Sequence, residues 1–457
     1  MTLATDPLLA PVPSSLPPVE RVARLPAGFK AGGLTAGIKA SGRPDLALIV
    51  VTQGPAAAAA VFTPNRFAAA PVRLSEANLL ATMPDGRGRW GWAEAVVSTS
   101  GSANAATGAA GDADQAEIGR AVAGVSGAIE RRVLHLSTGL IGTRLPVERV
   151  RAGLERLAPA LASTDEGLLA AAEALRTTDS VTKVATAQVE VADSTGRPRT
   201  VTVSGIAKGV GMIHPRMATM LSVLLTDAGA PPAILAMILG RVAARTWNQL
   251  SVDGDTSTND TVFLLDSATR TAVMSLEPEA IAALERGVEA VARDLARQQA
   301  ADGEGASSLI SCQVSGAADD ADARAVARAV VSSSLVKAAV HGRDPNWGRI
   351  ASAAGNATLA DSAVLTASGL DPDEAARRSG SPARLDPAGL RIAIAGHLVY
   401  DGSAGGPVPF ERAAARSAMD APETLIRLDL GLGDGTGEAF GCDLTEAYVR
   451  ENSEYTT

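Results

Sequence analysis

Short apolar runs alternate with long amphipathic stretches along this 457-residue chain, and no other feature restricts its fold as strongly. Apolar runs of about four to eight residues are typical of buried strands, whereas the longer stretches repeat apolar residues with a helical period. Strands interleaved with helices favour a layered α/β fold, in which helices cover the faces of sheets. We expect strands at residues 45–52, 60–63, 71–74, 94–98, 133–137, 200–204, 391–395 and 425–430, and helices at residues 112–131, 165–176, 231–249, 278–300 and 320–334.

Two segments lack this alternation. Residues 1–26 are rich in proline and have no positively charged start, so we expect a disordered lead-in rather than a signal peptide. Residues 369–388 are rich in aspartate, serine, glycine and proline, which predicts a disordered, flexible insertion. No apolar run approaches the length that is needed to span a bilayer.

Charge and cysteine content limit the classes of function. The net charge of −9 argues against a general binder of nucleic acids or membrane surfaces, although a local basic site for an acidic substrate would fit. The two cysteines, Cys312 and Cys442, are too few for a disulfide scaffold and favour the cytoplasm. The four histidines have no partners at metal-ligand spacing, so we expect no metal site. These features favour small-molecule chemistry.

A glycine-rich turn leads through a proline to a threonine in residues 208–219. Gly209 and Gly211 allow an unusual backbone path. A chain that cuts itself between Ala218 and Thr219 would place a free α-amine beside the threonine hydroxyl, which is the base that such a nucleophile needs. The cut also needs hydrogen-bond donors for the oxyanion that forms. An ordinary threonine at the start of a buried strand explains the same residues, and local chemistry alone favours that simpler interpretation.

The same window resembles the cleavage segment of the ornithine acetyltransferase (glutamate N-acetyltransferase) family. The resemblance extends over nearly the whole chain from residue 27. Similar motifs follow one another in the family's order, and together they are highly specific. They lie at residues 28–39, 61–66, 70–72, 100–105, 137–142, 145–146, 208–213, 217–221, 251–260, 302–306, 342–350 and 452–457.

The resemblance implies a chain that cuts itself into residues 1–218 and 219–457. Residues 27–218, which follow the lead-in, form the alpha chain, and residues 219–457 form the beta chain. The fold would be a layered α/β sandwich like that of N-terminal-nucleophile hydrolases, and the pieces would form an α2β2 heterotetramer. In the implied ping-pong reaction of arginine biosynthesis, Thr219 takes acetyl from N2-acetylornithine, ornithine leaves, and glutamate accepts the acetyl group. No cofactor or metal takes part, although acetyl-CoA remains an alternative donor.

The resemblance also assigns residues to the site. Thr138 and Gly139 would hold the oxyanion. Lys208 can pair with a substrate carboxylate and Glu304 with an ammonium group. The turn formed by Asp344, Asn346, Trp347 and Arg349 is expected to be structural. The implied substrate contacts are Thr177, Lys208, Thr219, Glu304, Asn452 and Thr457.

Three positions depart from the family's pattern. Arg216 stands where the family usually has a short asparagine or aspartate, Ser308 replaces a lysine, and Ser102 replaces an asparagine. The implied catalytic residues are intact. The three changes therefore bear on which substrate is used more than on the acyl-transfer chemistry. Two alternatives follow: a specialised paralogue that moves acyl groups between other amines in a natural-product pathway, and a self-cleaving amidohydrolase or aminopeptidase that uses water as acceptor.

Overall fold

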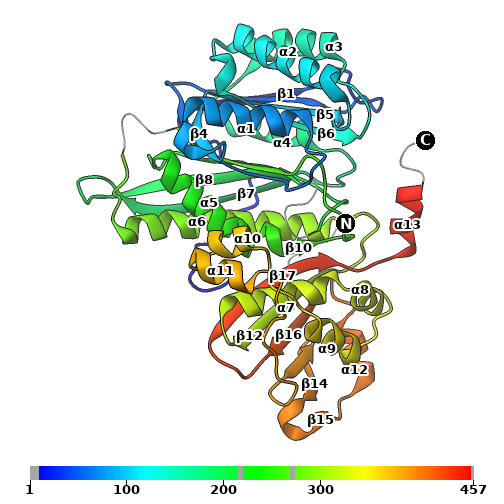
Figure 1. Cartoon of the computed structure of the whole chain (residues 1–457). Coiled ribbons are helices and arrows are strands. Elements are labelled where there is room, and N and C mark those ends of the chain that lie inside the picture. Colours follow the sequence, from blue (N-terminus) through cyan, green and yellow to red (C-terminus); the bar gives the residue numbers. More distant parts are fainter. Residues whose placement is uncertain (1–9, 215–219, 268–272, 454–457) are drawn as a thin grey trace.

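The computed structural model describes residues 10–214, 220–267 and 273–453. Helices and sheets alternate in layers through the upper part of the molecule (Figure 1). The first sheet has four strands in the order β1-β2-β5-β6, of which only β5 and β6 are parallel. Its strands are β1 (Phe29–Leu34), β2 (Leu46–Val51), β5 (Ala95–Ser102) and β6 (Val133–Leu140).

Helices cover both faces of this sheet. Helices α2 (Gly108–Ser126) and α3 (Val147–Leu157) pack on its outer face. Helices α1 (Ala70–Thr82) and α4 (Asp165–Leu175) pack on its inner face and also contact the second sheet, so they separate the two sheets. The predicted layered α/β architecture is therefore confirmed.

The second sheet has six strands in the order β4-β3-β11-β9-β8-β7. Its central strands β9 and β11 are parallel and buried along their whole length, because helices lie on both faces. Strands with two buried faces read as continuous apolar runs. Helices α5 (Pro232–Arg245) and α6 (Pro278–Ala301) cover the face away from the first sheet. The strands are β3 (Ala56–Phe62), β4 (Trp90–Ala93), β7 (Lys183–Ala192), β8 (Pro198–Lys208), β9 (Leu221–Thr226) and β11 (Thr261–Asp266).

A third sheet forms the lower part of the molecule, with the strand order β10-β17-β12-β16-β13-β14-β15. Helix α7 (Asp320–Ser332) packs on β12 and β17. The strands are β10 (Leu250–Ser251), β12 (Leu309–Ala317), β13 (Arg391–Ile394), β14 (His397–Asp401), β15 (Gly406–Pro407), β16 (Glu423–Asp429) and β17 (Gly435–Cys442). The remaining helices are α8 (Ser334–His341), α9 (Trp347–Gly355), α10 (Ser362–Ala367), α11 (Pro372–Arg378), α12 (Arg412–Ala418) and α13 (Glu446–Ser453). No helix in the described ranges is long and apolar enough to cross a membrane.

The predicted strand at residues 71–74 is wrong. These residues lie in helix α1, with Pro71 in its first turn. Proline is tolerated there because the first helical N–H groups have no partner within the helix. The apolar run reflects the helix face that is buried against β6.

The segment 369–388 is structured rather than a disordered insertion. It contains helix α11, whose start is capped by Asp371. Arg378 donates to Asp319 at 2.7 Å, and Arg384 donates to the buried Asp322 at 2.6 Å. These two carboxylates belong to the start of α7, so ion pairs that composition cannot reveal fix the segment to the third layer.

The expected disorder of the lead-in is wrong for residues 10–26, while residues 1–9 lie outside the described ranges. Ala10 is buried, and its N–H donates to Glu423 at 2.8 Å. Its carbonyl accepts from Arg297 at 3.1 Å. Further along, Glu20 pairs with Thr186 of β7 in an antiparallel bridge. The lead-in therefore binds both the second and the third layers.

Candidate active site

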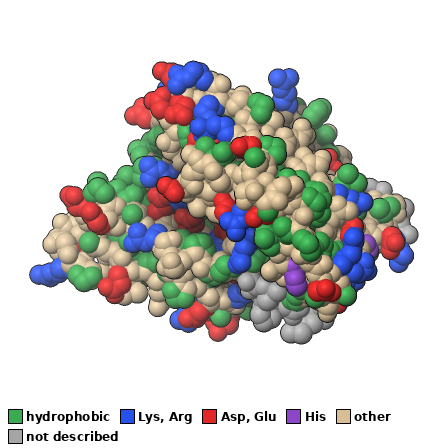
Figure 2. Space-filling model, turned by 90° about the horizontal axis from the view of Figure 1, so that it is seen from below, with side chains coloured by type: hydrophobic (Ala, Val, Ile, Leu, Met, Phe, Trp, Pro, Cys, Tyr) green, Lys and Arg blue, Asp and Glu red, His purple; other side chains and the backbone are tan. Residues whose placement is uncertain are grey.

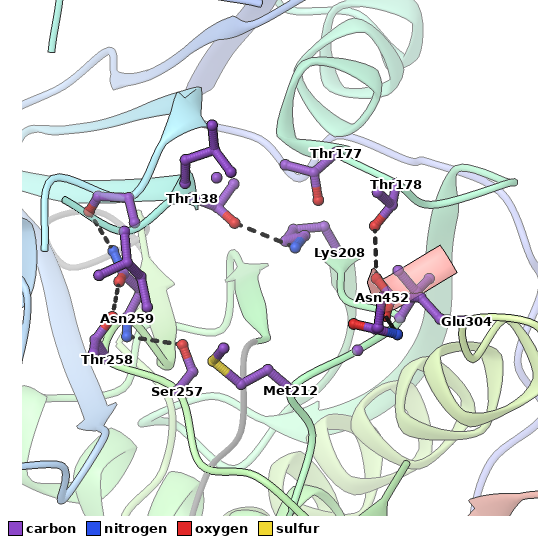
Figure 3. A pocket seen from close by; sticks show the side chains of 16 residues that line it. Thr138, Thr177, Thr178, Lys208, Met212, Ser257, Thr258, Asn259, Glu304 and Asn452 are labelled. Carbon is purple, nitrogen blue, oxygen red and sulfur yellow. Dashed lines mark hydrogen bonds between the residues drawn. The ribbon is translucent and has the colours of Figure 1, made fainter. Parts of the chain in front are cut away.

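A cavity of about 270 Å³ lies where strands β6 and β8 end. Figure 3 shows its polar side chains facing one another from several elements that are distant in sequence. Helix α13 closes one side with Asn452, and the loop before β11 closes another. The lining residues are Ala103, Thr138, Gly139, Leu140, Ile141, Thr177, Thr178, Lys208, Val210, Gly211, Met212, Ser257, Thr258, Asn259, Glu304 and Asn452.

The two predicted oxyanion residues stand at the end of β6. The Thr138 side chain is buried, and its Oγ1 accepts a hydrogen bond of 3.2 Å from Lys208 Nζ. Gly139 has a φ of 133°, and a Cβ there would lie 2.4 Å from the Gly101 carbonyl carbon. Only glycine fits so close to the neighbouring strand. Since Thr138 accepts from Lys208, its own hydroxyl hydrogen is free to point into the cavity.

Lys208 ends strand β8 and is only 3% exposed. Burial lowers the pKa of its ammonium, because the charged form loses its hydration. Asp179, Glu304 and Asp260 act in the opposite direction. A buried cation of this kind is suited to bind a carboxylate that enters the cavity.

Glu304 supplies an opposite charge elsewhere in the cavity lining. Its carboxylate accepts from Thr178 Oγ1 at 3.2 Å and from Asn452 Nδ2 at 3.0 Å, as Figure 3 shows. Gly211 lies against it, and a Cβ at that position would come 2.2 Å from Glu304 Oε2. Two donors and one close glycine therefore fix the carboxylate.

The structure brings together every predicted site residue that it describes: Thr138, Gly139, Thr177, Lys208, Glu304 and Asn452 all line this cavity. Three predicted residues, Ala218, Thr219 and Thr457, lie outside the described residues, as does Arg216. The nearest described residue after the predicted cut is Met220, whose N–H donates to Asp260 at 3.0 Å.

Sequence reasoning missed several lining residues, among them Thr178, Met212 and Asn259. The signal for Asn259 was its place in a glycine, serine and asparagine cluster at residues 253–261. Its Nδ2 donates to the carbonyls of Ala103 and Ser137, at 2.7 and 2.8 Å, and so ties the loop before β11 to strand β6 and to the residue that follows β5. A similar cluster at residues 342–350 lies apart from the cavity lining and serves structure, since Asn346 caps helix α9.

Two departures from the family pattern lie outside the cavity lining. Ser102 Oγ donates to the Thr143 carbonyl at 2.7 Å. The Ser308 N–H donates to Asp443 at 2.9 Å. Neither serine side chain is among the groups that line the cavity.

The described residues contain no group of three histidine, cysteine or acidic side chains that could hold a metal ion. Acidic and basic side chains are interspersed over the face drawn in Figure 2. That face therefore carries no broad area of a single charge of the kind that attracts nucleic acids.

The ArgJ family model matches residues 30–457. The chain belongs to the ArgJ family. It is 44% identical to the arginine biosynthesis bifunctional protein ArgJ of a Synechococcus strain over 94% of this chain and 96% of that protein. It is 43% identical to the protein of the same name from Thermus thermophilus, over 95% and 99%. The family predicted from the motifs is confirmed, as is the enzyme class, an N-acyltransferase.

Solved structures include members of the same family. The arginine biosynthesis bifunctional protein ArgJ from Bacillus halodurans is 35% identical, covers 50% of this chain and 95% of its own, and has a TM-score of 0.42. The ornithine acetyltransferase from Mycobacterium tuberculosis, solved with ornithine, is 36% identical over 43% of this chain and 97% of its own, with a TM-score of 0.37.

Proposed function

We propose that this ArgJ family member moves acetyl from N2-acetylornithine to glutamate in arginine biosynthesis, after it cuts itself between Ala218 and Thr219. The observation that carries the proposal is the cavity itself. A buried cation, Lys208, and a carboxylate, Glu304, face the same space, and Thr138 and Gly139 stand beside the cation. An amino acid with a carboxylate and a second, distant amine matches this arrangement of charges.

The reaction proceeds in two acyl transfers. The Thr219 hydroxyl gives its proton to its own α-amine and attacks the acetyl carbonyl. Thr138 Oγ1 and the Gly139 N–H stabilise the oxyanion. When the intermediate collapses, the amide bond breaks and the proton passes to the leaving α-amine of ornithine. The amine of glutamate then attacks the acetyl-threonine ester, which regenerates the free hydroxyl.

Lys208 and Glu304 orient the donor. Lys208 takes its α-carboxylate, which places the adjacent acetyl group near Thr138. Glu304 takes the δ-ammonium group. Fixing both ends converts an encounter in solution into an oriented reaction, which is a large part of enzymatic rate enhancement.

The proposal also covers the assembly of the two pieces, the cofactors and the cellular compartment. The pieces 1–218 and 219–457 stay together, as an α2β2 heterotetramer, and neither a cofactor nor a metal takes part. Acetyl-CoA remains an alternative donor. The buried cysteines Cys312 and Cys442 carry free thiols, which supports the cytoplasm as the compartment.

The intact mass of the purified protein, measured before and after brief exposure to N2-acetylornithine, tests the proposal. We expect two fragments that meet at Ala218 and Thr219, with the mass of one acetyl group added to the later fragment. Cut fragments without acetylation would point to another acyl donor and to the specialised paralogue. An uncut chain would remove the threonine mechanism. Acetate released equally with and without glutamate would identify a hydrolase.

Replacing Gly211 by alanine should displace Glu304, because the added Cβ would lie 2.2 Å from its carboxylate. A misplacement of about 1 Å can cost roughly a hundredfold in rate, so we expect a loss of that order in kcat/KM for N2-acetylornithine. Gly124→Ala is the matched control, since a Cβ there meets nothing within 4 Å. Equal activity of the two variants would contradict the role of Glu304.

A further inference from the structure

Asp179 lies behind the cavity wall and joins two loops that line it. Its side chain is buried, and both carboxylate oxygens are used. Oδ2 accepts from the Thr177 N–H at 3.0 Å, and Oδ1 accepts from the Gly209 N–H at 2.8 Å. The Asp179 carboxylate therefore fixes two backbone positions: Thr177 in the loop after α4, and Gly209, which directly follows Lys208.

The same carboxylate begins a buried row of alternating charges. Lys183 Nζ, which is fully buried, donates to Asp179 Oδ1 at 2.7 Å and to Asp302 Oδ2 at 2.6 Å. Asp302 is held in turn by the Ser180 N–H at 3.1 Å. Buried ion pairs of this kind add little net stability, because the lost hydration offsets the attraction. A contribution to the cavity therefore accounts for the row better than stability does.

Two members of the row, Asp179 and Lys183, act electrostatically on Lys208. Burial lowers the pKa of Lys208. Asp179 is the largest of the influences that raise this pKa. Burial also opposes ionisation of Asp179, but Lys183, Lys208 and the Gly209 N–H outweigh it and hold the pKa of that carboxyl well below its usual range. Asp179 is thus a negative charge that acts on the lysine, and its bond to the Gly209 N–H fixes it to the residue that follows the lysine.

Other charges face the same pair. Glu304 and Asp260 raise the pKa of Lys208, and Lys183 lowers it. Lys39 interacts with both Asp179 and Lys208, and burial together with Lys208 lowers its own pKa to about 8. Asp302 is not among the main charges that act on Lys208. Removing Asp179 and removing Asp302 should therefore have different effects on the lysine.

We propose that Asp179 is a positioning residue: it supplies the counter-charge of Lys208 and fixes the two loops so that this ammonium faces Thr138 and an incoming carboxylate. The identity of that carboxylate rests on the proposed function, whereas the electrostatic influence of Asp179 on Lys208 does not. The test is therefore designed without substrate.

The apparent pKa of Lys208 can be measured by competitive labelling of amines with acetic anhydride across a pH series, followed by mass spectrometry of the peptide that contains Lys208. Asp179→Asn should lower this pKa by on the order of one unit, because a nearby opposite charge is lost. Asp302→Asn is the matched control, since it also removes a buried partner of Lys183 but should cause no comparable shift.

Lys183→Met should shift the pKa of Lys208 in the opposite direction from Asp179→Asn. It tests the inference on its own if Asp179→Asn does not fold. It removes a cation and leaves the Asp179 bonds to Thr177 and Gly209 intact, so the pKa of Lys208 should rise. A Lys208 pKa that falls no further in Asp179→Asn than in Asp302→Asn, or that does not rise in Lys183→Met, would overturn the inference.

Activity supplies a separate readout. If wild-type protein turns over N2-acetylornithine, the alkaline limb of kcat/KM should move to lower pH in Asp179→Asn, because Lys208 loses its proton earlier. If the alkaline limb of kcat/KM in Asp179→Asn stays at the wild-type pH, that result would also count against the inference. An inactive wild-type protein with the expected labelling shifts would overturn the proposed function and leave the role of Asp179 standing.

Discussion

Thr219→Ala should give a chain that stays in one piece and transfers no acetyl group. Both events need the same hydroxyl. It first attacks the Ala218 carbonyl, the peptide C–N bond breaks to leave an ester and a free α-amine, and water hydrolyses the ester; the freed hydroxyl then attacks the acetyl donor. Removing the nucleophile of a hydrolase costs roughly a millionfold in kcat, and we expect a loss of that order. Intact mass measures the cut, and release of ornithine from N2-acetylornithine measures the transfer.

Thr219→Ser is the matched control, because serine keeps both a hydroxyl and, after the cut, an adjacent α-amine. It should therefore cut itself and retain measurable transfer. A Thr219→Ala chain that is still cut at this bond would show that scission does not depend on the hydroxyl. An uncut Thr219→Ala chain with wild-type turnover would place the nucleophile elsewhere.

The motifs named residues that the structure brings to one place, and the roles assigned to them stay predictions. Thr138, Lys208 and Glu304 are far apart in sequence and meet in one cavity, as their place in the family's motifs implied. The motifs do not contain Asp179, and they assigned no role to Asn259, although it lies in the motif at residues 251–260. These side chains bond to the backbone of segments that are far away in sequence, as Asp179 does at Gly209 and Asn259 does at Ser137. Neither apolar periodicity nor local spacing carries that information.

The fold was predicted where burial leaves a simple pattern. The runs at residues 45–52 and 133–137 lie on strands β2 and β6, because a strand buried on both faces is mainly apolar, although β6 also buries His135 and Ser137. Pro71 was misread because an apolar run at a helix start resembles a short strand. The segment 369–388 was misread because its order depends on ion pairs with the start of α7.

Thr138→Val should lower kcat by roughly 10²- to 10³-fold, the usual cost of losing one oxyanion donor. Valine keeps the shape of the buried side chain, so the strand and the cavity should survive. The loss should appear mainly in kcat, because the hydroxyl would donate to charge that develops only in the transition state. Rates must be compared per cut chain, since the same donor can assist self-cleavage.

Thr138→Ser separates this role from a second one, because Thr138 Oγ1 also accepts from Lys208 Nζ at 3.2 Å. Serine keeps the hydroxyl and should stay within about tenfold of the wild-type kcat. If Thr138→Val instead raised KM and left kcat unchanged, the hydroxyl would act by holding Lys208 for substrate binding. In that case Gly139 would be the remaining oxyanion donor of the predicted pair, and its N–H would have to carry most of the stabilisation.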